Sequence, residues 1–323
     1  MLYYNNLRDI VLHHHELLDV DELIILSGYV GPEPIGMLSE VDIKSTVIYG
    51  MYGAEKIGKA LHDSLCRVKR TLPNTNILYS KIPVHSKCYV WLKEGKVQGA
   101  LVGSANFSLS GLMNPYKEVL ADASRDTFSP LKDYLSIVTN ECIDCNDSSI
   151  VFKKTKSIVT PQDSLIGRLP LTSAKLKGEV PLRSGLNWGF SDVAHVTKGD
   201  AYIPIPAEFI RANEGLIPPK QDHPLLDVVS GRRDRNNDII DLIWDDGTLM
   251  QGLLEQNSTI DGVVYPKALS SSPNKNELGL YIRRRMGLPA DAIITRADLL
   301  RYGRTDVGIS KQGDGIYALD FSV

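Results

Sequence analysis

The sequence is short of cysteine, of long apolar runs and of positive charge. Four cysteines occur in 323 residues, all in the first half, and no signal peptide precedes them, so we expect reduced thiols and a cytoplasmic location. No apolar run approaches the length that spans a bilayer, which argues against a membrane protein. The net charge of -3 argues against indiscriminate binding to nucleic acid and leaves a local basic face open.

Metal-binding patterns are also scarce. Cys142-Ile-Asp-Cys145 has the spacing of a metal or redox pair, but no matching second pair follows. The run His13-His14-His15 falls on an expected helix, where successive side chains point about 100° apart and cannot meet at one ion. We therefore expect no metal site and no cofactor.

The chain length suggests two domains, each large enough to bury a core. We predict a catalytic and dimerisation domain over residues 1–150, a polar linker over 151–172 and a recognition domain over 173–323. Periodicity in the first half predicts an α/β domain, with helices over 4–18, 54–68 and 129–142, and strands over 23–30, 41–49, 76–82, 88–92, 97–102 and 118–122. Ser129 is the expected cap of its helix and Pro130 lies in the first turn.

The second half is predicted to be mainly β, which favours a small barrel or sandwich. Its expected strands are 186–188, 201–205, 239–244, 262–265 and 316–321. Its expected helices are 207–213, 276–286, which ends before Gly287, and one that begins at Thr295 with Asp298 in its first turn.

One stretch of the first half carries chemistry. His85-Ser86-Lys87 precedes a predicted hairpin that turns at Glu94-Gly95-Lys96, and Gly103-Ser104-Ala105-Asn106 follows its second strand. Residues two apart on a strand share a face, so His85 and Lys87 should meet Ser104 and Asn106. An imidazole can attack phosphorus while ammonium, hydroxyl and amide groups donate to the non-bridging oxygens. Glu118 is predicted to hold the other ring nitrogen of His85.

These residues resemble the signature of the phospholipase D superfamily, in which a His-x-Lys pair is followed by Gly-Ser and Asn. The family's usual aspartate five positions after the lysine is Leu92 here, as in a nuclease branch where a later glutamate, such as Glu118, takes its role. The family combines two such motifs, and this sequence has one. The resemblance therefore implies a homodimer with one composite site, a phosphohistidine intermediate and no divalent cation.

A second resemblance covers the other half. The phrases Gly185-Leu186-Asn187-Trp188-Gly189 and Arg301-Tyr302-Gly303-Arg304-Thr305-Asp306 are similar to the C-terminal half of NgoFVII-type and BfiI-like restriction endonucleases. That half is a B3-like pseudobarrel whose two arms read double-stranded DNA in the major groove. The arms here would lie near 183–192 and 251–274. Their side chains suit base and phosphate contacts, and the expected DNA-binding residues are Arg183, Asn187, Trp188, Gln251, Gln256, Asn257, Lys267, Ser270 and Asn274.

The two resemblances together imply a type II-like restriction endonuclease, which a helicase-like ATPase partner can accompany. Two alternatives share these features: a DNA-binding module with an inactive catalytic half, and a phospholipid phosphodiesterase. Several basic residues also have a structural explanation. The turn Arg232-Arg233-Asp234-Arg235 is as well explained by solvent exposure as by phosphate contact. At least one of Arg283, Arg284 and Arg285 should be an ion-pair partner, and Trp188 suits the core or the base of an arm.

Overall fold

The computed structural model describes residues 1–153, 166–192, 196–221 and 237–323. The chain divides into two compact units. One comprises Met1–Thr155 and Gln312–Ile316, and the other comprises Lys156–Lys311 and Tyr317–Val323. No helix in the described residues is both long enough and apolar enough to cross a membrane.

The first unit is built on an eight-stranded sheet of order β1-β7-β6-β5-β2-β3-β4-β8. β2, β3 and β4 are parallel neighbours and the other described pairings are antiparallel. The strands are β1 (Leu2–Tyr3), β2 (Glu22–Ser27), β3 (Lys44–Tyr49), β4 (Thr75–Ser80), β5 (Cys88–Lys93), β6 (Lys96–Gly103), β7 (Leu120–Asp122) and β8 (Cys142–Asp144). The predicted β5–β6 hairpin is confirmed, with Cys88 opposite Val102.

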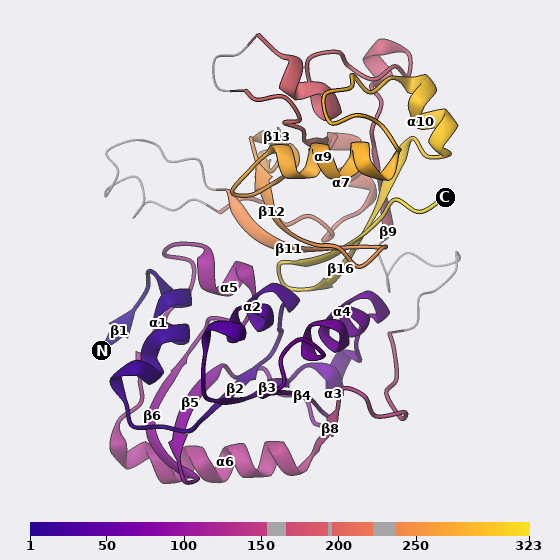
Figure 1. Ribbon diagram of the computed structural model, residues 1–323. Helices are drawn as coiled ribbons and strands as arrows, with labels where there is room; N and C mark the ends of the chain where they lie inside the picture. The colour runs from indigo at the N-terminus through magenta and orange to yellow at the C-terminus, as the bar shows by residue number, and fades with distance from the viewer. Residues whose placement is uncertain (154–165, 193–195, 222–236) are drawn as a thin grey trace. The chain divides into compact units, whose positions relative to one another are not determined.

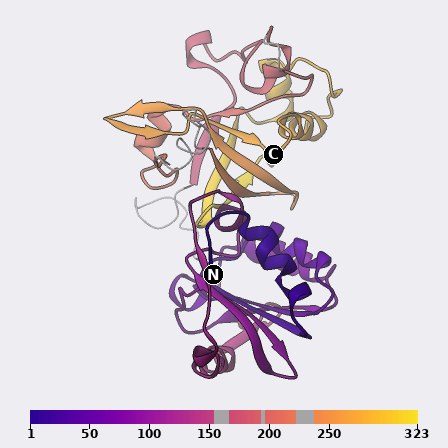
Figure 2. The same cartoon turned by 90° about the vertical axis from the view of Figure 1, so that its left-hand side faces the viewer.

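Helices cover both faces of this sheet. Figure 1 and Figure 2 show α6 on one face and α1, α2 and α4 on the other. Leu135 and Val138 of α6 pack against Val90 and Leu92 in one buried cluster, because those strand residues point toward that helix. The helices are α1 (Leu7–His13), continued as 3-10 helix by His14–Leu17, α2 (Pro32–Gly36), α3 (Tyr52–Glu55), α4 (Lys59–Lys69), α5 (Leu109–Met113) and α6 (Phe128–Asn140).

The second unit contains a seven-stranded sheet of order β10-β15-β12-β11-β17-β16-β9. Its edge strands β10 and β9 approach each other, so the sheet is nearly closed into a barrel around a single apolar cluster. The strands are β9 (Ile166–Pro170), β10 (Ile203–Pro204), β11 (Asp238–Trp244), β12 (Leu249–Glu255), β15 (Ala268–Ser271), β16 (Asp306–Gly313) and β17 (Ile316–Asp320), with a separate hairpin of β13 (Ser258–Ile260) and β14 (Val263–Tyr265).

Three helices of this unit, α7 (Ala207–Ala212), α9 (Asn276–Arg285) and α10 (Arg296–Tyr302), match the predicted ones. The start of α10 is confirmed in detail, because Thr295 and Asp298 form a reciprocal capping box. Gly287 follows α9 with a φ of 67°, a left-handed conformation that glycine adopts without steric cost.

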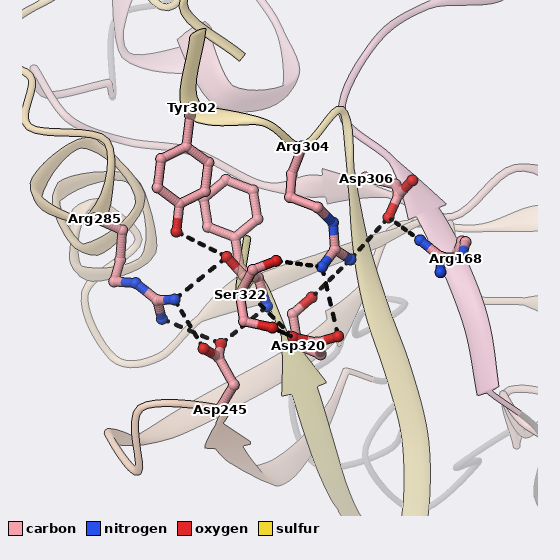
Figure 3. Close-up of polar contacts among 9 residues, drawn as sticks. Arg168, Asp245, Arg285, Tyr302, Arg304, Asp306, Asp320 and Ser322 are labelled. Carbon is pink, nitrogen blue, oxygen red and sulfur yellow. Dashed lines mark hydrogen bonds and ion pairs between the residues drawn. The ribbon is translucent and has the colours of Figure 1, made fainter. Parts of the chain in front are cut away.

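An ion-pair network ties the end of the chain to the barrel (Figure 3). Arg285 binds Asp245 through two hydrogen bonds of 3.1 and 2.8 Å. Arg304 binds Asp306 at 3.0 Å and the Ser322 carbonyl oxygen at 2.6 Å, while Arg168 of β9 reaches the same Asp306 carboxylate at 3.2 Å. The prediction that one of the three consecutive arginines is an ion-pair partner is therefore confirmed at Arg285.

Some local predictions were wrong. Residues 186–188 are not a strand but lie in a 3-10 helix, Gly185–Phe190, because the main chain bonds itself locally, with the Asn187 NH donating to the Ser184 carbonyl oxygen at 3.2 Å. Thr127, not Ser129, precedes the first residue of α6, although Pro130 does lie in the first turn. The expected linker 151–172 contains β9, which pairs with β16. Residues 154–165 of that linker and the turn 232–235 lie outside the described residues.

Candidate active site and candidate nucleic-acid interface

Three predicted catalytic side chains, from two segments of the chain, converge on Gly28. This glycine directly follows β2, whereas His85 and Lys87 precede β5 and Asn106 follows β6. A Cβ atom placed on Gly28 would lie 3.1 Å from His85 Cδ2, 3.2 Å from Lys87 Nζ and 3.4 Å from Asn106 Oδ1. Strands β6, β5 and β2 are neighbours in the sheet, and the three side chains therefore lie together beyond the same ends of these strands.

Lys87 is buried and its ammonium group faces His85. Its Nζ lies 3.0 Å from His85 Nδ1 and donates to the His85 carbonyl oxygen at 2.5 Å. Burial lowers the pKa of Lys87, and the negative charge of Glu118 opposes that shift. His85 itself is exposed. The pair therefore presents an accessible imidazole backed by a buried cation.

Asn106 is buried and held by its amide oxygen. Oδ1 accepts a hydrogen bond from the Tyr29 main-chain NH at 3.1 Å and lies 3.3 Å from Ser27 Oγ. Ser27 Oγ in turn accepts from the Phe107 main-chain NH at 2.9 Å. These hydrogen bonds join the end of β2 to the segment after β6. Because they hold the amide oxygen of Asn106, they also fix the direction in which its NH2 group can donate.

Ser104 and Glu118 form a second part of the site. Ser104 Oγ accepts from the Val119 main-chain NH at 3.1 Å, and the Ser104 hydroxyl also bonds the Glu118 carboxyl group. Burial raises the pKa of Glu118, and the Ser104 hydroxyl and the Lys117 charge oppose that rise. Within the described residues Glu118 makes no hydrogen bond to His85 and is bonded by Ser104 instead, so an orienting role for Glu118 stays a prediction.

Two functional-site positions were missed by sequence reasoning, Gly28 and Tyr29. Their signal was available in principle, because Ser27-Gly28-Tyr29 ends a buried strand and small residues at a strand end often line a site. Leu92, where the superfamily has its aspartate, lies in the core beneath α6 and is 4% exposed. A charged side chain at that position would be desolvated, so this sheet has no place for the missing aspartate.

The second unit carries a groove of about 940 Å³. Its polar and basic lining includes Arg168, Lys175, Tyr202 and Lys267, and its floor is apolar. The groove also includes Ser184 and Gly185, at the start of the predicted first arm. Lys267, from the predicted second arm, is exposed there. Segments of both predicted arms therefore border one concavity, whose lining is mostly apolar and includes basic side chains and the acidic Glu208.

Four of the other predicted DNA-binding residues are exposed or half-buried and make few contacts. Arg183 pairs with Asp192 inside the first arm. Asn257 accepts from Lys220 Nζ at 3.1 Å, and Gln256 occupies the turn after β12 with a φ of 59°. Asn274 is exposed beside β15. These positions remain predictions as DNA contacts.

Asn187 and Ser270 are fully buried, so the structure does not present either side chain to DNA. The Asn187 amide donates to the Pro181 and Ile294 carbonyl oxygens at 3.0 and 2.8 Å, and accepts from the Ile294 NH at 2.8 Å. It therefore fastens the first arm to the body of the domain. The Ser270 hydroxyl has no hydrogen-bond partner among the described residues.

Trp188 and Gln251 are neither fully buried nor fully exposed. Trp188 is half-buried, with its ring edge-on to Tyr202 at 5.9 Å and the Lys275 ammonium 5.0 Å from its ring centroid. This placement suits the base of an arm. Gln251 is half-buried in β12, in register with Asp241 of β11.

Comparison with known proteins agrees with both halves. Residues 5–151 match the model of the NgoFVII restriction endonuclease N-terminal PLD domain, and residues 151–313 match that of the NgoFVII C-terminal B3-like DNA-binding domain. A search of curated proteins finds no match. Similar solved structures include NucT from Helicobacter pylori, 18% identical, covering 45% of this chain and 97% of its own with a TM-score of 0.33. Nuc from Salmonella typhimurium, described as a phospholipase D family member, is 12% identical, covers 42% and 89%, and has a TM-score of 0.30. By its two family matches, which span residues 5–313, the chain belongs to the NgoFVII restriction endonuclease family, with a phospholipase D-like nuclease domain and a B3-like DNA-binding domain.

Proposed function

We propose that this chain is a sequence-specific, type II-like endonuclease that hydrolyses double-stranded DNA through a phosphohistidine at His85. The convergence of His85, Lys87 and Asn106 on Gly28 carries the proposal. His85 is exposed to a substrate, while Lys87 is anchored behind it. In the first step a ring nitrogen of His85 bonds to phosphorus and the P–O bond to the leaving oxygen breaks. Lys87 and Asn106 donate to the non-bridging oxygens as negative charge develops there.

A second imidazole is needed to protonate the leaving oxygen and then to take a proton from the water that hydrolyses the P–N bond. The other described histidines of this unit are engaged elsewhere. His13 bonds Glu16, His14 packs on Trp91, His15 faces Asp42 and His62 bonds Tyr79. We therefore propose that His85 of a second copy supplies this group, in one active site shared by a homodimer.

The proposed reaction uses no divalent cation, and the donor set supports this. The Lys87 ammonium lies 3.0 Å from the His85 ring and offers the positive charge that a metal ion would otherwise bring to the phosphate. A second cation at that position would be repelled. Formation and hydrolysis of the phosphohistidine are then both expected to depend on side chains and on no metal ion.

The B3-like domain is proposed to bind the recognised sequence in the groove bordered by Lys267, Lys175 and Tyr202. Basic side chains at its rim would contact phosphates, and the two arms would reach base edges. Since recognition and chemistry belong to different domains, we expect cleavage beside the recognised sequence.

Subunit mixing tests the composite site. Wild-type protein is mixed with an equal amount of His85→Ala protein under conditions that allow subunits to exchange, and DNA cleavage is measured. If one site needs His85 from both copies, only wild-type dimers are active. The activity of the mixture should then be about one quarter of that of wild-type protein at the same total concentration. An activity of about one half would mean that each subunit acts alone. Lys59→Ala protein, altered on a distant helix face, serves as the mixing control.

A further inference from the structure

Tyr29 holds one catalytic group through its main chain. It follows Gly28 at the end of β2, and its NH donates to Asn106 Oδ1 at 3.1 Å. Its carbonyl oxygen accepts from Ser27 Oγ at 2.6 Å. The position of the Asn106 amide therefore depends on the conformation of Tyr29.

The side chain of Tyr29 contacts the other catalytic group. Its ring stands edge-on to the His85 ring, with centroids 6.0 Å apart and an interplanar angle of 82°. This is the arrangement that aromatic pairs prefer. One residue thus contacts both His85 and Asn106, from neighbouring strands of the sheet.

The far end of the Tyr29 ring is tethered. Its hydroxyl donates to Glu55 Oε1 at 2.6 Å, and the other carboxylate oxygen of Glu55 accepts from Lys153 Nζ at 2.9 Å. Burial alone would raise the pKa of Glu55, but the bonds from Tyr29 and Lys153 lower it overall. Burial, together with Glu55, raises the pKa of Tyr29. A charged acceptor therefore faces a protonated donor, a strong form of hydrogen bond.

We propose that Tyr29, tethered by Glu55, is a positioning residue that sets the orientation of His85 and Asn106 for attack on the phosphodiester. This role rests on the proposed function and touches no transferred atom. The ring limits the rotation of the imidazole, the main chain fixes the amide, and the bond to Glu55 stops the ring from turning away. Misplacement of a catalytic group by about 1 Å can cost about 100-fold in rate.

Hydrolysis of bis(p-nitrophenyl) phosphate tests the role, because this small diester needs no DNA recognition. Tyr29→Leu removes the ring and its tether, and we expect kcat to fall about 100-fold with little change in KM. Tyr29→Phe keeps the ring and loses the tether, so a loss of about 10-fold is expected. Glu55→Gln keeps an acceptor oxygen but loses its charge, so its loss of kcat should be smaller than that of Tyr29→Phe. Tyr52→Phe, which removes a hydroxyl that accepts from the Val151 NH, is the matched control.

A double-mutant cycle separates this role from general loss of structure. Tyr29→Phe and Glu55→Ala remove the same hydrogen bond, so the double variant should lose no more kcat than the worse single variant. Additive losses would overturn the proposal, as would a Tyr29→Leu protein with wild-type kcat or with a change confined to KM. An inactive wild type would instead overturn the proposed function, and this role with it.

Discussion

Gly28→Ala is the most direct perturbation of the site geometry. The added methyl group would lie 3.1 Å from His85 Cδ2 and 3.2 Å from Lys87 Nζ, a few tenths of an ångström inside ordinary contact. Gly28 does not have a positive φ, so its main-chain conformation is open to alanine. The strain falls on the catalytic side chains. Lys87 is the more flexible of the two, but to move away its Nζ must give up the 2.5 Å bond to the His85 carbonyl oxygen.

We expect Gly28→Ala to lower kcat for a small phosphodiester by about 10- to 100-fold. The free energy of unfolding should change by less than about 1 kcal/mol. Alanine lowers the conformational entropy of the unfolded chain, and this stabilisation offsets a modest clash in the folded state. Initial rates and urea unfolding measure the two quantities. Gly36→Ala is the control, since its Cβ would meet only Val68 at 4.0 Å. Wild-type kcat in Gly28→Ala would refute the convergence of the three side chains at this point.

Three further predictions concern stability and binding. Arg285→Ala removes two hydrogen bonds to the Asp245 carboxylate, which keeps the one from the Phe321 NH, and should cost the second unit about 2 kcal/mol in urea unfolding, without changing hydrolysis of the small diester. Burial raises the pKa of Glu118, so the stability it contributes is complete below about pH 4 and is lost as pH rises through the raised pKa. Glu118→Gln should therefore gain stability relative to wild type on going from about pH 4 to about pH 8, and an unchanged difference would contradict the burial argument. Lys267→Ala should weaken DNA binding and reduce the slope of log K against log salt by about 0.9, if Lys267 contacts one phosphate.

The general architecture could be predicted from the sequence because it depends on local patterns. Two apolar runs on either side of Glu94-Gly95-Lys96 located the β5–β6 hairpin, and the phospholipase D-like and B3-like assignments are confirmed by the family matches. The start of the helix at Thr295, with Asp298 in its first turn, was predicted because the signal lies in residues three apart, and the structure adds that the two side chains form a capping box. Short strands such as β9 and β8 were missed because pairing with distant partners, not periodicity, defines them.

The site was predictable in part. The spacing of His85, Lys87 and Asn106 indicated a common site. The local sequence marks Gly28 and Tyr29 only as the end of a strand, and their proximity to His85 and Asn106 comes from the pairing of strands across the sheet. Asn187 has the right side chain for reading adenine, yet its amide bonds main-chain groups that are more than 100 residues apart from one another in the chain. Residue type suggests what a side chain can bind. Burial decides whether it is available.

DNA cleavage by this protein should depend on His85 and on no metal ion. The purified chain should be incubated with plasmid and phage DNA at low salt in EDTA, beside His85→Ala protein. We expect discrete fragments from the wild type alone, and the ends of these fragments would locate the recognised sequence. Equal cleavage by both proteins, or cleavage by the wild type only after a divalent cation is restored, would contradict this expectation.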